Sequence, residues 1–116
     1  MRNRIVVVVV LAVLVVAGAV LIFSNRGSGG QNVTINVTVT GGKTMQPSDL
    51  SAHQNDTVTI KVTSDADGEV HLHAYDVHFE TKAGQVVSQS FKADKTGDFP
   101  IEWESTSTPL GHLVIT

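Results

Sequence analysis

Two hydrophobic patterns divide the chain. Residues 5–23 form an unbroken apolar run, and as a helix this run would be about 28 Å long, close to the hydrocarbon thickness of a bilayer. Over residues 33–40 the pattern changes to strict alternation, in which Val or Ile is followed each time by Thr or Asn. A period of two is typical of a strand with one buried face. The pattern therefore predicts a transmembrane helix followed by a β domain.

Further strands are predicted at 56–64, 71–79, 85–93, 98–104 and 111–116. Turn-like sequences rich in Gly, Asp and Lys separate several of them. No segment after residue 31 has a helical period, and such short connections leave no room for helical crossovers. We expect an all-β fold, a Greek-key antiparallel β-sandwich with an N-terminal transmembrane helix.

The flanks of the apolar run predict its orientation. Arg2 and Arg4 precede it, which favours a cytoplasmic N-terminus at residues 1–4 and a single-pass anchor at 5–23. Residues 24–31 are a flexible Gly/Ser-rich tether, and 32–116 are expected to form the extracytoplasmic domain at the cell membrane. The small residues at 17–19 leave one alternative, a signal peptide that is cleaved to give a secreted domain.

Charge and cysteine content exclude several classes of protein. The sequence has no cysteine, so disulfides, a lipidated cysteine and thiolate metal ligands are absent. After residue 31 the chain carries five lysines against eleven acidic residues, a formal charge of −6. Nucleic acid is therefore not expected as a partner, because binding it requires a cationic surface.

The segment around His71 and His73 carries the most specific chemistry. In a strand, His71 and His73 share one face while Val70 and Leu72 share the other. Two imidazoles at this spacing stand about 6–7 Å apart, within reach of one transition-metal ion if a third ligand joins them.

Three segments resemble those of cupredoxins, in the same order along the chain. Residues 55–60 (NDTVTI) are similar to the turn and strand that lead into the first copper histidine, and His71 or His73 follows at about the expected distance. Residues 97–103 (GDFPIEW) are similar to the strand that carries the copper thiolate, and residues 109–115 (PLGHLVI) to the loop and final strand that bring in the axial methionine. The resemblance implies a cupredoxin-like sandwich over roughly residues 32–116.

The chain departs from that family at the copper ligands. Trp103 stands where the family has its cysteine, Thr106 at the position of the second histidine, and Pro109 or Leu110 at that of the methionine. A blue-copper centre needs a thiolate, two imidazoles and a weak axial donor. The resemblance therefore implies the fold but not blue-copper electron transfer, and we expect Trp103 to fill core volume instead.

A different metal site is the remaining expectation. If the cupredoxin arrangement holds, His71, His73 and His112 meet at one end of the sandwich, with Asp76 or His78 as additional ligands. Imidazole and carboxylate suit copper or zinc as divalent ions. The simpler alternative is that these histidines are solvent-exposed surface residues, or that one of them makes a buried hydrogen bond.

Two functions follow from this sequence. The first is a membrane-anchored, extracytoplasmic cupredoxin-like domain that binds copper or another divalent metal ion through exposed histidines. The alternative is a metal-free structural or protein-interaction module whose partner is another protein of the cell envelope. The hydroxyls of residues 105–108 have no ordered base beside them in the sequence pattern, so no catalytic residues are assigned and the chain is not expected to be an enzyme.

Overall fold

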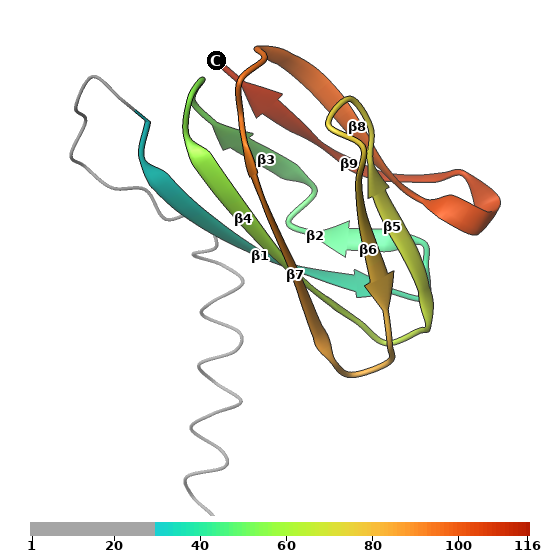
Figure 1. Ribbon diagram of the computed structural model, residues 1–116. Helices are drawn as coiled ribbons and strands as arrows, with labels where there is room; N and C mark the ends of the chain where they lie inside the picture. Colours follow the sequence, from blue (N-terminus) through green and yellow to red (C-terminus); the bar gives the residue numbers. More distant parts are fainter. Residues whose placement is uncertain (1–29) are drawn as a thin grey trace, which may run out of the picture.

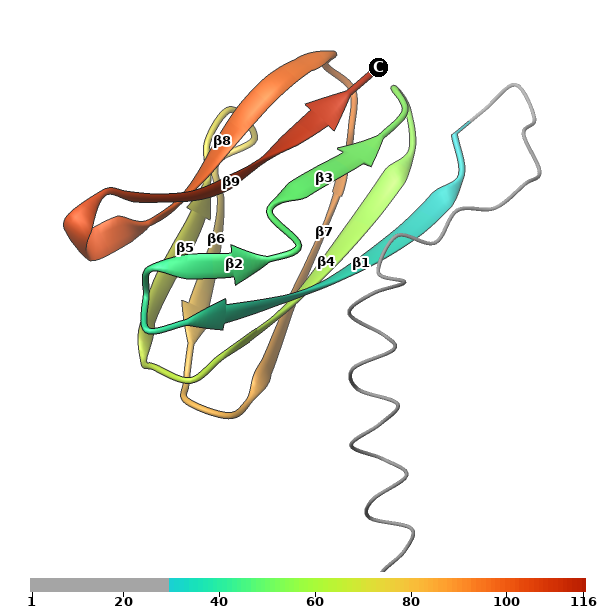
Figure 2. The same ribbon diagram turned by 180° about the vertical axis from the view of Figure 1, so that it is seen from behind.

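The computed structural model describes residues 30–116, which form two β-sheets packed face to face (Figures 1 and 2). The elements of this part of the chain are β1 (Asn32–Thr40), β2 (Thr44–Gln46), β3 (Asp49–Ala52), β4 (Thr57–Ser64), β5 (Gly68–Leu72), β6 (Val77–Thr81), β7 (Val86–Lys92), β8 (Gly97–Trp103), the 3-10 turn η1 (Glu104–Thr106) and β9 (Thr108–Ile115).

The predicted anchor lies outside the described residues. This holds for the cytoplasmic N-terminus at 1–4, the transmembrane helix at 5–23 and all but the end of the tether at 24–31. Within residues 30–116, no helix has the length and hydrophobicity needed to cross a bilayer.

The two sheets are mixed rather than purely antiparallel. One has the strand order β2-β1-β4-β7 and the other β3-β9-β8-β5-β6. β1 pairs with β4 in parallel, and so does β3 with β9, while the remaining pairs are antiparallel. The prediction of an antiparallel sandwich is therefore wrong for these two pairs. Alternating hydrophobicity specifies which face of a strand is buried, but it does not specify the direction of the neighbouring strand.

The core is formed by the inward positions of both sheets, as the alternation predicts. In β1 and β4 every second residue is buried, from Val33 to Val39 and from Val58 to Val62. The opposite sheet contributes apolar side chains of similar size: Leu50, Val70, Leu72, Phe79, Ile101, Leu113 and Ile115. Burial of these β-branched and aliphatic residues is the main force that holds the two layers together.

Trp103 fills the core at the end of β8, as expected for the residue that replaces the family's cysteine. It is 7% exposed and lies against the backbones of Gly42 and Gly68. A Cβ atom at Gly68 would come within 2.2 Å of the Trp103 ring, and one at Gly42 within 2.7 Å. Both glycines therefore leave the space that the indole occupies.

The prediction of one strand over 71–79 is wrong, because this segment folds back on itself as a hairpin. β5 ends at Leu72, residues 73–76 form a turn, and β6 returns from Val77. Ala74 and Asp76 have positive φ angles of 75° and 54°, so the chain reverses there and Ala74 lies exposed at the surface. The turn contains no Gly, Pro or Asn, but the apolar positions change phase in it, from Val70 and Leu72 to Val77 and Phe79. The prediction of one continuous strand overlooked this change of phase.

Candidate metal centre

The β5–β6 hairpin places two histidines side by side on the outer face of the five-stranded sheet. His71 on β5 pairs directly with His78 on β6. Their rings stack with centroids 4.1 Å apart and an interplanar angle of 9°. The core-facing neighbours Val70, Leu72 and Phe79 are buried, which fixes the hairpin register and directs both imidazoles outward.

Asp76, in the hairpin turn, joins the two rings. One of its oxygens, Oδ1, lies 3.2 Å from Nε2 of His71 and 2.9 Å from Nε2 of His78. The ligand atoms that these three residues offer all lie within 4.8 Å of one another. Ligands at the usual 2.0–2.1 Å around a tetrahedral ion are about 3.3 Å apart, so small side-chain adjustments would accommodate one ion.

The three side chains differ in their access to solvent. The side chain of His71 is 15% exposed, while that of Asp76 is 82% exposed. The group is therefore supported by the sheet on one side and open to water on the other. An ion could enter from solvent and keep water molecules as further ligands.

The second ring nitrogen of each histidine faces another carboxylate. Nδ1 of His71 lies 3.2 Å from Oε1 of Glu104, at the start of η1. Nδ1 of His78 contacts Oε2 of Glu69, two positions before His71 on β5. Each imidazole thus has Asp76 at Nε2 and a glutamate of its own at Nδ1.

These contacts shift two pKa values. The pKa of His78 is raised above its ordinary value of 6.5, first by the hydrogen bond with Glu69 and then by that with Asp76. The pKa of Asp76 is lowered below 3.8, mainly by its hydrogen bond with His78 and then by that with His71. An ion that binds Nε2 of His78 therefore competes with a proton that the raised pKa holds more tightly than on a free imidazole.

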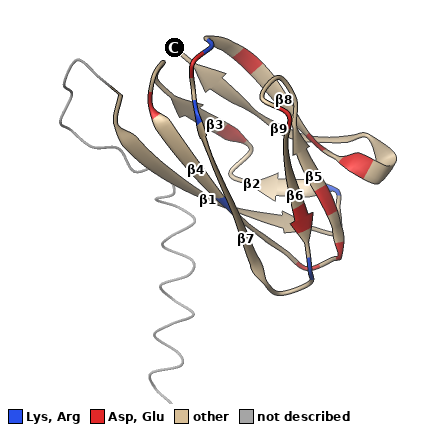
Figure 3. Cartoon of the chain, viewed as in Figure 1, with Lys and Arg blue, Asp and Glu red and all other residues tan. Residues whose placement is uncertain are grey.

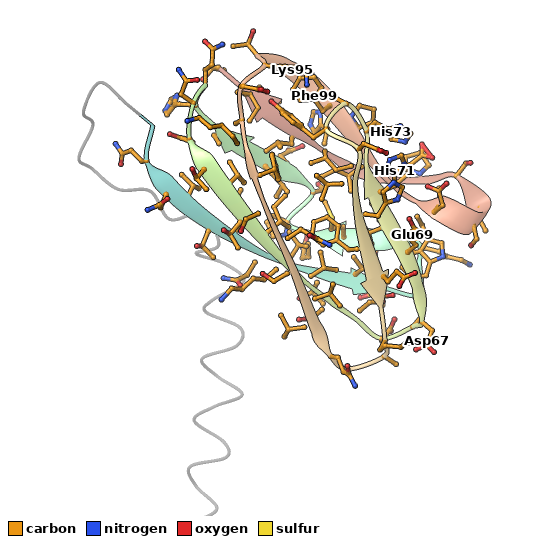
Figure 4. All side chains as sticks on the ribbon, viewed as in Figure 1. Asp67, Glu69, His71, His73, Lys95 and Phe99 are labelled. Atoms are coloured by element: carbon orange, nitrogen blue, oxygen red, sulfur yellow. The ribbon has the colours of Figure 1, made fainter. Side chains whose placement is uncertain are left out.

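His73 lies next to this group but outside it. Its ring centroid is 4.2 Å from that of His71, at 43°, and its backbone N–H donates to the carbonyl of Pro100. Figure 4 shows His71 and His73 beside each other, with Glu69 further along β5. Nε2 of His73 is 3.4 Å from a Glu102 oxygen, within ion-pair range, but it makes no hydrogen bond within the described part of the chain.

His112 belongs to a separate cluster. Its Nδ1 lies 2.7 Å from Asp98 on β8 and its Nε2 lies 2.8 Å from Asp49 on β3. These contacts raise the pKa of His112, that with Asp98 more than that with Asp49. On one side of β8, Pro100 pairs with His112 of β9, and on the other side its carbonyl accepts the backbone N–H of His73. The backbones of His112 and His73 are therefore about two strand spacings, or 10 Å, apart.

The structure thus brings together three of the five residues named from the sequence: His71, Asp76 and His78. It places His73 beside them and His112 with Asp49 and Asp98. Sequence reasoning missed the carboxylate partners of the rings. For Glu69 the only signal was its two-residue spacing from His71, and for Glu104, Asp49 and Asp98 there was none.

This face of the five-stranded sheet is acidic as a whole. Figure 3 shows carboxylate positions, in red, on β3, β8, β5 and β6. On these strands they belong to Asp49, Glu69, Glu80, Asp98 and Glu102, while Asp76 lies in the β5–β6 turn and Glu104 in η1. Such a surface attracts cations, and the field is strongest where several carboxylates surround one point.

The blue-copper ligand positions do not form a metal site. Trp103 is packed in the core, and Thr106 is exposed, with its hydroxyl hydrogen-bonded to that of Thr108. Met45 is buried, and the chain has no cysteine to supply a thiolate. The residues present therefore do not fit a blue-copper centre.

Solved structures of copper proteins share this fold. A chain of a heme-copper terminal oxidase dimer matches with a TM-score of 0.66 and 12% identity, over 99% of this chain and 95% of its own. The metal-binding domain of the Cu(I)-exporting P-type ATPase of Streptococcus pneumoniae, solved with Cu(I), matches with a TM-score of 0.64 and 9% identity, over 80% and 92%. A mutant of amicyanin, in its reduced Cu(I) form, matches with a TM-score of 0.50 and 13% identity, over 80% and 87%.

No family model and no curated protein matches the sequence. The shared architecture nevertheless defines the class of fold: residues 30–116 form a cupredoxin-like β-sandwich. The cupredoxin-like fold expected from the sequence resemblance is confirmed, with mixed sheets in place of antiparallel ones.

Proposed function

We propose that this protein is a membrane-anchored, extracytoplasmic cupredoxin-like domain that binds a divalent transition-metal ion at the β5–β6 hairpin. The ligands are Nε2 of His71, Nε2 of His78 and a carboxylate oxygen of Asp76. The convergence of these three ligand atoms within 4.8 Å of one another is the observation that carries the proposal.

The donor set favours Cu(II) or Zn(II) over Cu(I). Two imidazoles and one carboxylate suit these divalent ions, whereas Cu(I) is selected by thiolate and thioether sulfur. None of the ligands proposed here carries sulfur, and the two methionines of the chain, Met1 and the buried Met45, are not among them. The negative charge of Glu69 and Glu104 next to the two rings further favours a doubly charged ion.

The proposed role is binding or transfer of the ion rather than redox catalysis. Without a thiolate and an axial sulfur donor, the sandwich lacks the ligands that make a blue-copper site an electron carrier. Solved structures with the same fold are described as copper-binding, which supports metal handling as the function. The apolar run at 5–23 and the arginines before it support attachment to the membrane with the domain outside the cytoplasm.

Calorimetric titration tests the proposal. The full-length chain, purified in detergent micelles without a His tag, is titrated with ZnCl₂ and with a weakly chelated Cu(II) salt. We expect saturable binding of one ion per chain, lost in His71→Ala and in His78→Ala. His53→Ala is the matched control, because His53 is exposed and lies outside the group.

Two results would contradict the proposal. Absence of saturable binding would leave the metal-free interaction module as the function of this domain. Binding that survives both hairpin substitutions but is lost in His112→Ala would move the ion to the cluster formed with Asp49 and Asp98.

A further inference from the structure

We infer that Glu69 and Glu104 are positioning residues of the metal centre, each holding the Nδ1–H of one imidazole so that Nε2 is free for the ion. This inference rests on the proposed function. It extends that function by assigning the coordinating nitrogen of each ring and the residues that select it.

The His78 ring shows the arrangement most clearly. Glu69 and His71 lie on one face of β5, and His78 is directly opposite His71, so Glu69 is the diagonal neighbour of His78. Its Oε2 contacts Nδ1 of His78, while Nε2 of the same ring points to Asp76. The ring is thus held between a glutamate from the rigid strand and an aspartate from the turn.

The His71 ring repeats this arrangement with a residue from another element. Glu104 follows the buried Trp103 and begins η1, so its backbone is fixed where β8 ends beside β5. Its Oε1 lies 3.2 Å from Nδ1 of His71, while Nε2 of that ring is 3.2 Å from Asp76. Two carboxylates from different parts of the chain therefore hold the two rings in the same orientation.

The two ring nitrogens have different surroundings, and this decides which one binds. Both Nε2 atoms converge on the same oxygen of Asp76, whereas the two Nδ1 atoms each face their own glutamate. A metal-bound imidazole commonly donates its other N–H to a carboxylate, which fixes the tautomer and raises the basicity of the ligating nitrogen. One ion placed among the two Nε2 atoms and Asp76 leaves each Nδ1 beside its own glutamate, in a hydrogen bond for His78 and in an ion-pair contact of 3.2 Å for His71.

Affinity measurements on the full-length chain test the inference. We expect Glu69→Ala and Glu104→Ala each to weaken Zn(II) binding by about 10–100-fold, the usual effect of removing such a partner. Glu69→Gln and Glu104→Gln retain an oxygen acceptor for Nδ1–H and should recover part of that loss. Glu80→Gln is the charge control, since Glu80 is exposed, pairs with Glu69 across the hairpin and contacts neither ring in any hydrogen bond or ion pair of the described residues.

A spectroscopic readout separates positioning from general electrostatics. In ¹⁵N-correlated spectra of the Zn(II)-loaded protein, both hairpin imidazoles should carry the proton on Nδ1 and the metal on Nε2. Coordination of Zn(II) through Nδ1 would overturn the inference. If the wild type binds Zn(II), equal Zn(II) affinities of Glu69→Ala, Glu104→Ala and Glu80→Gln would overturn it as well. If the wild type binds no metal, the proposed function itself fails, together with this assignment.

Discussion

The buried carboxylate of Asp56 ties both sheets together at one end of the sandwich. Asp56 is 4% exposed, and its two oxygens accept hydrogen bonds from the backbone N–H groups of Gln31 at 2.9 Å and His53 at 2.8 Å. Gln31 leads into β1 of the four-stranded sheet, while His53 follows β3 of the five-stranded sheet. Asp56→Ala removes both acceptors and leaves two partly buried donors behind.

The expected loss follows from these contacts. Hydrogen bonds to a charged group contribute about 1.5–3 kcal/mol each, so the loss of both in Asp56→Ala should lower the free energy of unfolding by about 3–6 kcal/mol. Against a typical total of about 5–15 kcal/mol, this is a large fraction of the stability. Asp56→Asn retains one acceptor oxygen and should lose about half as much.

Denaturant unfolding measures this loss directly. Trp103 is the single tryptophan and is buried, so its fluorescence in urea follows the β domain even in the full-length chain. Asp94→Ala serves as the control. The Asp94 side chain is exposed and forms a long ion pair of 3.9 Å with the exposed Lys95, which contributes less than about 1 kcal/mol. If Asp56→Ala loses less than about 1 kcal/mol at an unchanged denaturant slope, the Asp56 carboxylate does not tie the two sheets together.

Three further predictions concern packing, pH and the hairpin turn. Gly68→Ala places a Cβ within 2.2 Å of the Trp103 ring. The free energy of unfolding in urea should fall by about 1–3 kcal/mol, and the fluorescence maximum of Trp103 should shift; an unchanged urea midpoint would contradict this packing. The pKa of His112 is raised above 6.5 by Asp98 and Asp49, so the protonated imidazole stabilises the fold below pH 6.5, and this stabilisation is lost as the pH rises through the raised pKa. On alkalinisation the wild type should therefore lose more stability than His112→Ala. Parallel pH profiles of the two proteins would contradict the contacts of His112 with Asp49 and Asp98. Tyr75→Phe removes two hydrogen bonds of the hydroxyl, one donated to the Lys95 carbonyl at 2.7 Å and one accepted from the Lys95 N–H at 3.0 Å. The free energy of unfolding should fall by about 1–2 kcal/mol in the same assay, and a variant as stable as the wild type would disprove this.

The strands that could be predicted are those with long, regular alternation. β1 and β4 combine Val and Ile inward with Thr outward over eight or nine residues, so their existence and buried face follow from the sequence. β2 and β3 are three and four residues long, with Met45 the one buried position of β2, and too short for a recognisable period. The parallel pairing of β1 with β4 depends on how the chain passes between the sheets, which local patterns do not encode.

The candidate site was predictable in its residue types but not in its arrangement. His71, His78 and Asp76 could be named because imidazole and carboxylate are metal ligands and lie close in the sequence. Their geometry arises from the turn at 73–76, which places His78 opposite His71 rather than further along one strand. Glu104 could not be found at all, because it reaches His71 only through the pairing of β8 with β5.

An anomalous difference map would locate the bound ion itself. Crystals of the full-length chain loaded with Zn(II) are measured on both sides of the zinc absorption edge. We expect one peak per chain, about 2.0–2.2 Å from Nε2 of His71, Nε2 of His78 and an oxygen of Asp76. A peak beside His112, or no ordered peak near the β5–β6 hairpin, would contradict it.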